Sequence, residues 1–166
     1  MTDIENIIEV ALVHQRNGKL QRARYLYDKI LKIDPRNSDA IHLMGMIEYS
    51  DHKYELAIAL IEKAIKLSPG IPDYHINLTS CYIAVLNLVN AKRHALIAIT
   101  LDQNAYKAYY NLGNILFAEG DSEGAVINYK KALSIKSDNQ SIWSNYLFAL
   151  NFSVGSNPET IFLENR

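Results

Sequence analysis

The chain has 166 residues, of which 49% are hydrophobic and 21% are charged, and it contains one cysteine, Cys81. This composition supports a buried core and excludes a long disordered tail. A net charge of −1 argues against a nucleic-acid-binding protein and against electrostatic attachment to an anionic membrane. A single cysteine forms no internal disulfide, so we expect a reducing, cytoplasmic environment.

No targeting or membrane segment is expected. The first residues, MTDIENIIEV, carry acids where a secretory signal carries bases. The longest apolar stretch, residues 81–89, is interrupted by Asn87 and is far shorter than the ~20 residues that span a bilayer.

An internal repeat organises the sequence. The clearest column of equivalent positions holds Ala23, Ala57, Ala91 and Ala125, which follow one another at one constant interval. Periods of about 34 residues are typical of stacked helical hairpins. We expect repeats at 4–37, 38–71, 72–105 and 106–139, a partial fifth at 140–153, and a loop with a terminal helix at 154–166.

Each repeat is expected to form two helices. In the fourth repeat, Tyr109, Leu112 and Leu116 share one helical face, and Gly120-Asp121 then indicates a turn before a second helix. No segment alternates usefully with period two, so we expect no strands. The third repeat has no Gly or Pro between its helices, and its turn is expected at residues 86–88.

The fourth repeat resembles a tetratricopeptide repeat, and the first and second repeats share some of the same characteristic residues. The resemblance is carried by the 34-residue period and by Leu112-Gly113, Ala125, Tyr129, Ala132, Pro35 and Pro69. Departures are Thr79 for the usual Gly, and Gln103 and Ser137 for the usual Pro. The resemblance implies an all-α, right-handed superhelix (an α-solenoid) whose first helices line a concave groove, and that groove usually binds peptides or other proteins.

One polar column is expected to lie in this groove. Asn77, Asn111 and Asn145 recur at the interval of the repeat, although Asn is a poor helix former. A carboxamide donates and accepts, so a ladder of them could pair with the backbone of an extended peptide. Asn114 would lie one turn from Asn111. Alternatively, these amides bond between neighbouring repeats or are solvated.

Aromatic residues are expected on or near the same face. Tyr110, Phe117 and Tyr49 could form apolar pockets between the Asn residues, or could instead contact the adjacent repeat or the final helix. An acidic C-terminal tail would need several basic groups here. The face has only Arg16 and Lys107, with Asp39 and Asp73 between them, which argues against such a carboxylate clamp.

No catalytic, metal or cofactor site is indicated. The histidines match no metal-ligand spacing, and no phosphate-binding glycine loop or nucleophile motif occurs. His75 occupies a core column, so we expect a buried structural histidine, and Cys81 is expected to be packed inside. This chain alone is therefore not expected to be an enzyme.

The C-terminal segment, 141–166, carries a second resemblance. This segment resembles the junction between the repeats and the catalytic domain in O-linked N-acetylglucosamine transferases and their bacterial relatives. The matching residues are Ser144, Asn145, Leu147, Leu150, Asn151, Pro158, Glu159, Phe162 and Arg166, with Asn165 where His is usual. It implies an N-terminal, substrate-recruiting part of a longer nucleotide-sugar glycosyltransferase.

Other interpretations remain open. The chain could be a stand-alone adaptor or oligomerisation scaffold, or a module ahead of a different enzyme such as a methyltransferase or sulfotransferase. Ile4, Ile7 and Ile8 open the N-terminal end, which predicts self-association through the ends of the repeat stack.

Overall fold

The computed structural model describes residues 3–153, and all of the regular structure in that range is α-helix. The helices are α1 (Asp3–Arg16), α2 (Leu20–Ile33), α3 (Ser38–Ser50), α4 (Tyr54–Leu67), α5 (Pro72–Ala84), α6 (Leu88–Leu101), α7 (Tyr106–Ala118), α8 (Ser122–Ile135) and α9 (Gln140–Leu150). The terminal helix expected after Asn157 lies outside the described residues. No helix within residues 3–153 combines the length and the apolarity that crossing a bilayer requires.

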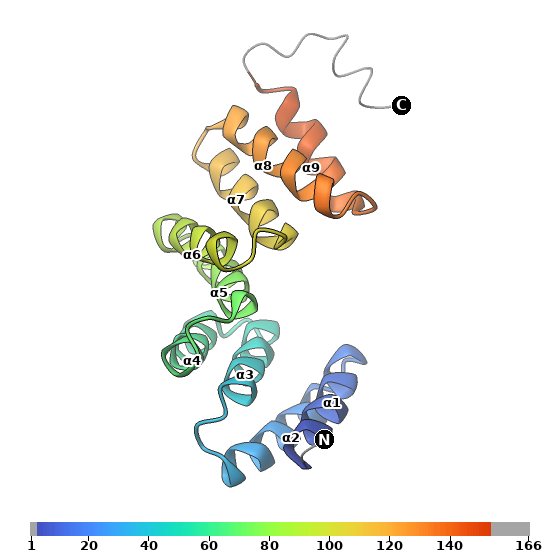
Figure 1. The fold of residues 1–166 in the computed structure, drawn as a ribbon, viewed down its shortest axis with the longest axis vertical. Helices are drawn as coiled ribbons and strands as arrows, with labels where there is room; N and C mark the ends of the chain where they lie inside the picture. Colours follow the sequence, from blue (N-terminus) through green and yellow to red (C-terminus); the bar gives the residue numbers. More distant parts are fainter. Residues whose placement is uncertain (1–2, 154–166) are drawn as a thin grey trace.

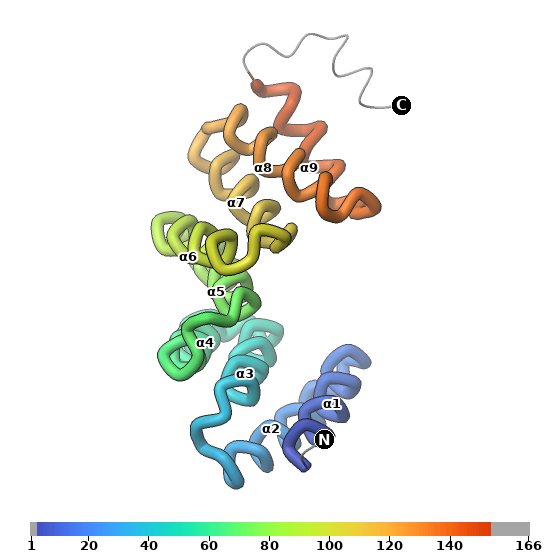
Figure 2. Tube along the Cα trace, viewed as in Figure 1, coloured from blue at the N-terminus to red at the C-terminus, as the bar shows by residue number. Residues whose placement is uncertain are grey.

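Consecutive helices pair into antiparallel hairpins that stack along a curved path (Figure 1). The pairs are α1–α2, α3–α4, α5–α6 and α7–α8, and α9 packs on α8 at the far end from the N-terminus (Figure 2). Each hairpin therefore contacts mainly its neighbours in the chain, as in a solenoid. The isoleucines expected to open the N-terminal end, Ile4, Ile7 and Ile8, are half-buried against the core of the first hairpin.

Small residues let the two helices of a hairpin approach closely. The alanine column at 23, 57, 91 and 125 is fully buried. A Cβ added to Gly113 would lie 2.5 Å from Cε1 of Tyr129. The third repeat has Thr79 and Ala95 at those two positions, both fully buried, so a larger residue on the first helix accompanies a smaller one on the second. This exchange explains why the third repeat has Thr79 where a glycine is usual.

The turn inside each hairpin requires a left-handed backbone conformation. The equivalent residue of each of the four hairpins adopts it, with φ of 71° at Gly18, 61° at His52, 58° at Leu86 and 86° at Gly120. Glycine does so without steric cost, whereas a residue with a Cβ is strained. The turn of the third hairpin lies at residues 85–87, one residue before the expected 86–88, because Leu88 already begins α6, and it forms at the expense of strain at Leu86.

Candidate functional site

The candidate site is the groove along the first helices of the repeats. One hollow of about 330 Å³ lies across α5, α7 and the start of α9, and its lining includes Asn77, Ser80, Lys107, Tyr110 and Asn111. A second, of about 410 Å³, lies across α1, α3 and the start of α2. Its lining is Leu12, Gln15, Arg16, Leu20, His42, Leu43, Met46, Ser50 and Asn77. Asn77 belongs to both, so the two hollows meet at this residue.

Asn77 is held by the preceding repeat. Its Nδ2 lies 2.8 Å from Nε2 of His42, whose ring stacks on Tyr74 at a centroid distance of 4.4 Å. Burial lowers the pKa of His42 to about 4. The imidazole is therefore neutral near pH 7, and its Nε2 can accept a hydrogen bond from the amide of Asn77.

Asn111 is held in the same way. It is buried on α7, and its Nδ2 donates to Oγ of Ser80 at 3.3 Å. Ser80 in turn donates to the carbonyl of Ile76 at 3.3 Å. The orientation of the Asn111 amide is thus set by the preceding first helix, α5.

Asn145 and Asn114 join α7, α8 and α9. Nδ2 of Asn145 lies 3.1 Å from Oη of Tyr110 and 2.9 Å from Oδ1 of Asn114. The hydroxyl of Tyr129 donates to the same Oδ1 of Asn114 at 2.8 Å. Neither Asn145 nor Asn114 lines the two hollows. Their amides serve contacts between helices.

All three members of the Asn column therefore use Nδ2 for a bond to the preceding repeat. Bonding between neighbouring repeats is one of the three arrangements that the sequence left open. For Asn77 and Asn111, the structure places no hydrogen-bond donor from residues 3–153 on Oδ1. The acceptor half of each amide is accordingly available in the groove.

The three aromatic residues expected in the groove have different positions. Tyr110 lines the 330 Å³ hollow. Phe117 packs against Phe148 and Phe152, with ring centroids 5.5 and 5.8 Å away, and Tyr49 packs beside Tyr54 at 5.5 Å. Phe117 and Tyr49 line neither hollow. Their rings instead pack against neighbouring elements of the fold.

Sequence reasoning missed His42 and Ser80, which position the groove amides. Ser80 follows Asn77 by three residues, the same spacing that pointed to Asn114 beside Asn111. Applying that rule to every repeat would have found it. Nothing in the sequence distinguished His42, because its column also holds Ile8, Ile76 and Tyr110.

The buried histidines and the cysteine have structural surroundings. The expected burial of His75 is confirmed, and its Nδ1 lies 3.0 Å from Nδ1 of His94. Burial lowers the pKa of both, that of His94 to about 4, and raises the pKa of the Cys81 thiol to about 12. Across residues 3–153, no three His, Cys, Asp or Glu side chains converge as a metal ion would require.

Comparison with known proteins identifies the repeats. Residues 38–71 and 106–139 each match a tetratricopeptide repeat model. The chain is 30% identical over 102 residues to small glutamine-rich tetratricopeptide repeat-containing protein 2 of Saccharomyces cerevisiae, covering 61% of this chain and 30% of that protein. It is 26% identical over 129 residues to BBSome complex member BBS4 of Xenopus tropicalis, covering 78% and 25%. The chain thus spans about a quarter to a third of the length of these relatives.

Solved structures share the fold. A crystal structure of MamA superposes with a TM-score of 0.78 at 22% identity, covering 97% of this chain and 88% of that one. PilF of Pseudomonas aeruginosa gives 0.85 at 18% identity, covering 97% and 71%. The first tetratricopeptide domain of RPAP3, bound to the HSP90 peptide SRMEEVD, gives 0.68 at 22% identity, covering 71% and 94%. The chain therefore folds as an all-α superhelix built from tetratricopeptide repeats.

Proposed function

We propose that this chain is a protein-binding module whose groove holds an extended peptide segment. The observation that carries the proposal is the meeting of two hollows at Asn77, which gives a path along the first helices. The RPAP3 domain, which has a similar fold, is bound to a peptide. Concave sites with a few placed polar groups are the usual form of a binding site.

The amides of Asn77 and Asn111 would accept hydrogen bonds from the peptide's backbone. His42 and Ser80 hold the two Nδ2 atoms, so each Oδ1 is oriented before a ligand arrives. Groups fixed in advance lose less conformational freedom on binding, which raises affinity. Recognition through backbone N–H groups would place few demands on the peptide's side chains.

The charges of the groove argue for a peptide that is not strongly acidic. Lys107 lines one hollow and Arg16 the other, so the two cations are not gathered in one place. Asp39 and Asp73 lie near His42, where their negative charge opposes the lowering of its pKa. An acidic chain end would meet these carboxylates as well as the cations.

The test is a peptide selected from a displayed library of extended random sequences. Its affinity is measured by calorimetry against the wild-type chain, Asn77→Ala/Asn111→Ala and the matched control Asn145→Ala. The double substitution should weaken binding by about fivefold or more, since two charge-free hydrogen bonds are worth about 1–3 kcal/mol together. The control, which lies outside the hollows, should bind within about twofold of wild type.

Two results would contradict the proposal. One is equal affinity of the wild-type chain and the double variant when circular dichroism shows unchanged helicity. The other is a library selection that returns no peptide. N-methylation of the selected peptide at alternate residues should also weaken binding, because it removes backbone donors.

A finer proposal concerns the protein to which the module belongs. Ser144, Asn145, Leu147 and Leu150 of the junction pattern lie on α9, and Asn151 follows its end; the remaining residues, Pro158 to Arg166, lie outside the described range. We propose that a glycosyltransferase domain follows. A stand-alone adaptor is the alternative, which the tetratricopeptide relatives also fit.

An antibody against this chain separates these proposals. A native mass well above 18.8 kDa, with transfer of N-acetylglucosamine from its nucleotide donor by the immunoprecipitate, would support the glycosyltransferase. A native mass of 18.8 kDa, or a larger protein without transfer activity, would exclude it.

A further inference from the structure

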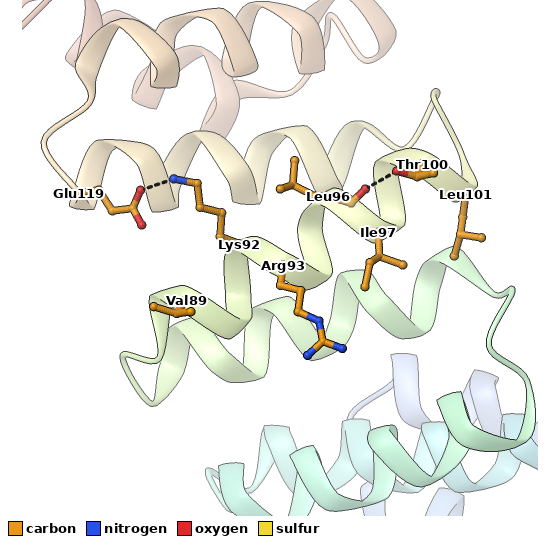
Figure 3. Close-up of a pocket in the computed structure, with 8 residues that line it drawn as sticks. All are labelled: Val89, Lys92, Arg93, Leu96, Ile97, Thr100, Leu101 and Glu119. Atoms are coloured by element: carbon orange, nitrogen blue, oxygen red, sulfur yellow. Dashed lines mark hydrogen bonds and ion pairs between the residues drawn. The ribbon is translucent and has the colours of Figure 1, made fainter.

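The outward face of α6 carries an open apolar surface (Figure 3). A hollow of about 610 Å³ is lined by Val89, Lys92, Arg93, Leu96, Ile97, Thr100, Leu101 and Glu119. It shares no residue with the two groove hollows. Val89 is 79% exposed and Leu96 is 48% exposed, so the apolar side chains face solvent.

The other repeats have polar residues at these positions. The position of Val89 is filled by Gln21, Glu55 and Glu123; that of Leu96 by Asp28, Glu62 and Lys130; and that of Ile97 by Lys29, Lys63 and Lys131. All four hairpins are built on the same pattern, so the hairpin itself does not require apolar residues there. Packing inside the repeat therefore does not account for Val89, Leu96 and Ile97 together.

Arg93 shows the opposite exchange. The other repeats have Tyr25, Ala59 and Ile127 at its position. Arg93 is exposed, and the structure gives it no ion pair with any residue in the range 3–153. Neighbouring Lys92 differs, since its Nζ lies 2.6 Å from a carboxylate oxygen of Glu119. Within the described part of the chain, the Arg93 guanidinium therefore has no ion-pair partner, although it lies among the apolar side chains of Val89, Leu96 and Ile97.

The spacing of these residues matches a helix lying along α6. Val89 precedes Arg93 by four residues, and Leu96 and Ile97 follow Arg93 by three and four, which are the helical intervals of neighbouring side chains. In Figure 3, Arg93 and Ile97 extend to one side of α6, and Lys92 and Leu96 extend to the side of Glu119. A partner helix could cover the apolar side chains while a carboxylate at its edge meets the guanidinium.

We propose that the outward face of α6 docks an amphipathic helix of a partner protein. The helix presents an apolar stripe to Val89, Leu96 and Ile97, and an Asp or Glu to Arg93. This surface acts independently of the peptide groove, because the two use different helices and different residues.

The central variant is Val89→Glu/Leu96→Glu/Ile97→Lys. It gives the third repeat the residues that the second repeat carries at the same positions, so the fold is expected to persist. The probe is a helical peptide from a displayed library with a fixed leucine stripe and randomised edge positions, selected on the wild-type chain. Selected peptides should be enriched in Asp or Glu at one edge, and the triple variant should bind them at least tenfold more weakly.

A charge exchange tests the role of Arg93. Arg93→Glu should weaken binding of the selected peptide at least tenfold, and replacing the acidic residue of the peptide by Lys should restore it. The matched control Glu55→Lys changes the position on α4 that corresponds to Val89, and should bind the peptide as wild type does. Asn77→Ala/Asn111→Ala should also leave this binding unchanged, which separates it from the groove.

Four results would overturn the proposal. They are a selection without acidic enrichment, equal binding by Arg93→Glu, a melting temperature of the triple variant lower by more than about 5 °C, and wild-type self-association that the triple variant abolishes. The third result would make the face part of internal packing. The fourth would make its occupant a second copy of this chain.

Discussion

The buried polar groups of the first three repeats differ in kind from those of α7–α9. In the first three repeats they include ionisable side chains, namely His42, Glu48, His75 and His94. In α7–α9, the contacts between helices use the amides of Asn111, Asn114 and Asn145 and the hydroxyls of Tyr110 and Tyr129. Hairpins with one common pattern are thus joined by two different chemistries.

The ionic contact between the first two repeats shows why the two kinds of contact respond differently to pH. Arg24 of α2 bonds to Glu48 of α3 and, at 3.0 Å, to Asp51. Glu48 is almost fully buried, and the bond from Arg24, together with Lys53, holds the pKa of its carboxyl below the usual value. Contacts of this kind depend on pH, whereas amide–hydroxyl contacts do not titrate below pH 7.

Acidification is expected to have the largest effect and to act on the first three repeats. Burial lowers the pKa of His42 and His94 to about 4 in the folded chain, against 6.5 for an ordinary histidine. The unfolded chain therefore binds protons first. Stability is complete above pH 6.5 and is lost as the pH falls toward 4, by about 3 kcal/mol for His42. His94 adds a loss in the same direction, and its contact with His75 contributes to the lowering of its pKa.

Two optical signals can resolve this effect along the chain. Circular dichroism reports all helices, whereas fluorescence of the single tryptophan, Trp143, reports α9, where its Nε1 donates to the carbonyl of Ser137 at 2.8 Å. Helicity should fall at a higher pH than the tryptophan signal changes. His42→Phe should reduce the pH dependence. Coincident transitions would show that the two regions do not differ in acid stability.

Removing Arg24 is expected to have the next largest effect. Arg24→Ala leaves the Glu48 carboxylate buried beside Lys53 alone, and should lower the free energy of unfolding by about 3 kcal/mol. Urea unfolding measures it, with Lys92→Ala as the control, because that exposed pair is worth below about 1 kcal/mol. Arg24→Met/Glu48→Leu should be more stable than Arg24→Ala. If Arg24→Ala lowered the free energy of unfolding no more than Lys92→Ala does, the stabilising role of the Arg24–Glu48 contact would be refuted.

The neutral contact should be weaker and insensitive to salt. Asn145→Ala removes the donor shared by Tyr110 and Asn114, and should cost about 1–2 kcal/mol in the free energy of unfolding. Urea unfolding at low and high salt should give the same loss, whereas the loss from Arg24→Ala should shrink at high salt. A salt-dependent loss for Asn145→Ala would contradict the distinction.

The hairpin turns should show the smallest effect. Leu86→Gly relieves a left-handed residue that is 83% exposed, and should raise the free energy of unfolding by up to about 1 kcal/mol. Gly120→Leu in the fourth repeat should lower it by about 1–2 kcal/mol. Thermal melting of the two variants checks the opposite signs. A lower melting temperature for Leu86→Gly would mean that its side chain contributes contacts.

The hairpins were predictable because they depend on neighbouring residues. Helical periodicity, the small residues at Ala125 and Gly113, and the turn at Gly120-Asp121 act within one repeat, so the sequence pattern is sufficient. The turn at Leu86 carries no such signal, yet it forms because the two helices around it must still pack as a pair.

The groove was predictable only in part. The repeat column placed Asn77, Asn111 and Asn145 on the first helices, but it did not say which atoms they bind. That choice depends on the polar atoms that the preceding repeat presents, which are His42 for Asn77, Ser80 for Asn111 and Asn114 for Asn145. These residues come from repeats that only the fold brings together.

The sequence by itself determined the repeat, the helical hairpins and the presence on α6 of apolar residues where the other repeats have polar or charged ones. Each of these is set by residue type at a fixed interval along the chain. Only the tertiary structure decided which amides remain open in the groove, and that Val89 and Leu96 are uncovered while Lys92 has a partner in Glu119. The physical reason is that exposure and hydrogen-bond pairing belong to contacts between repeats, which a one-dimensional pattern does not contain.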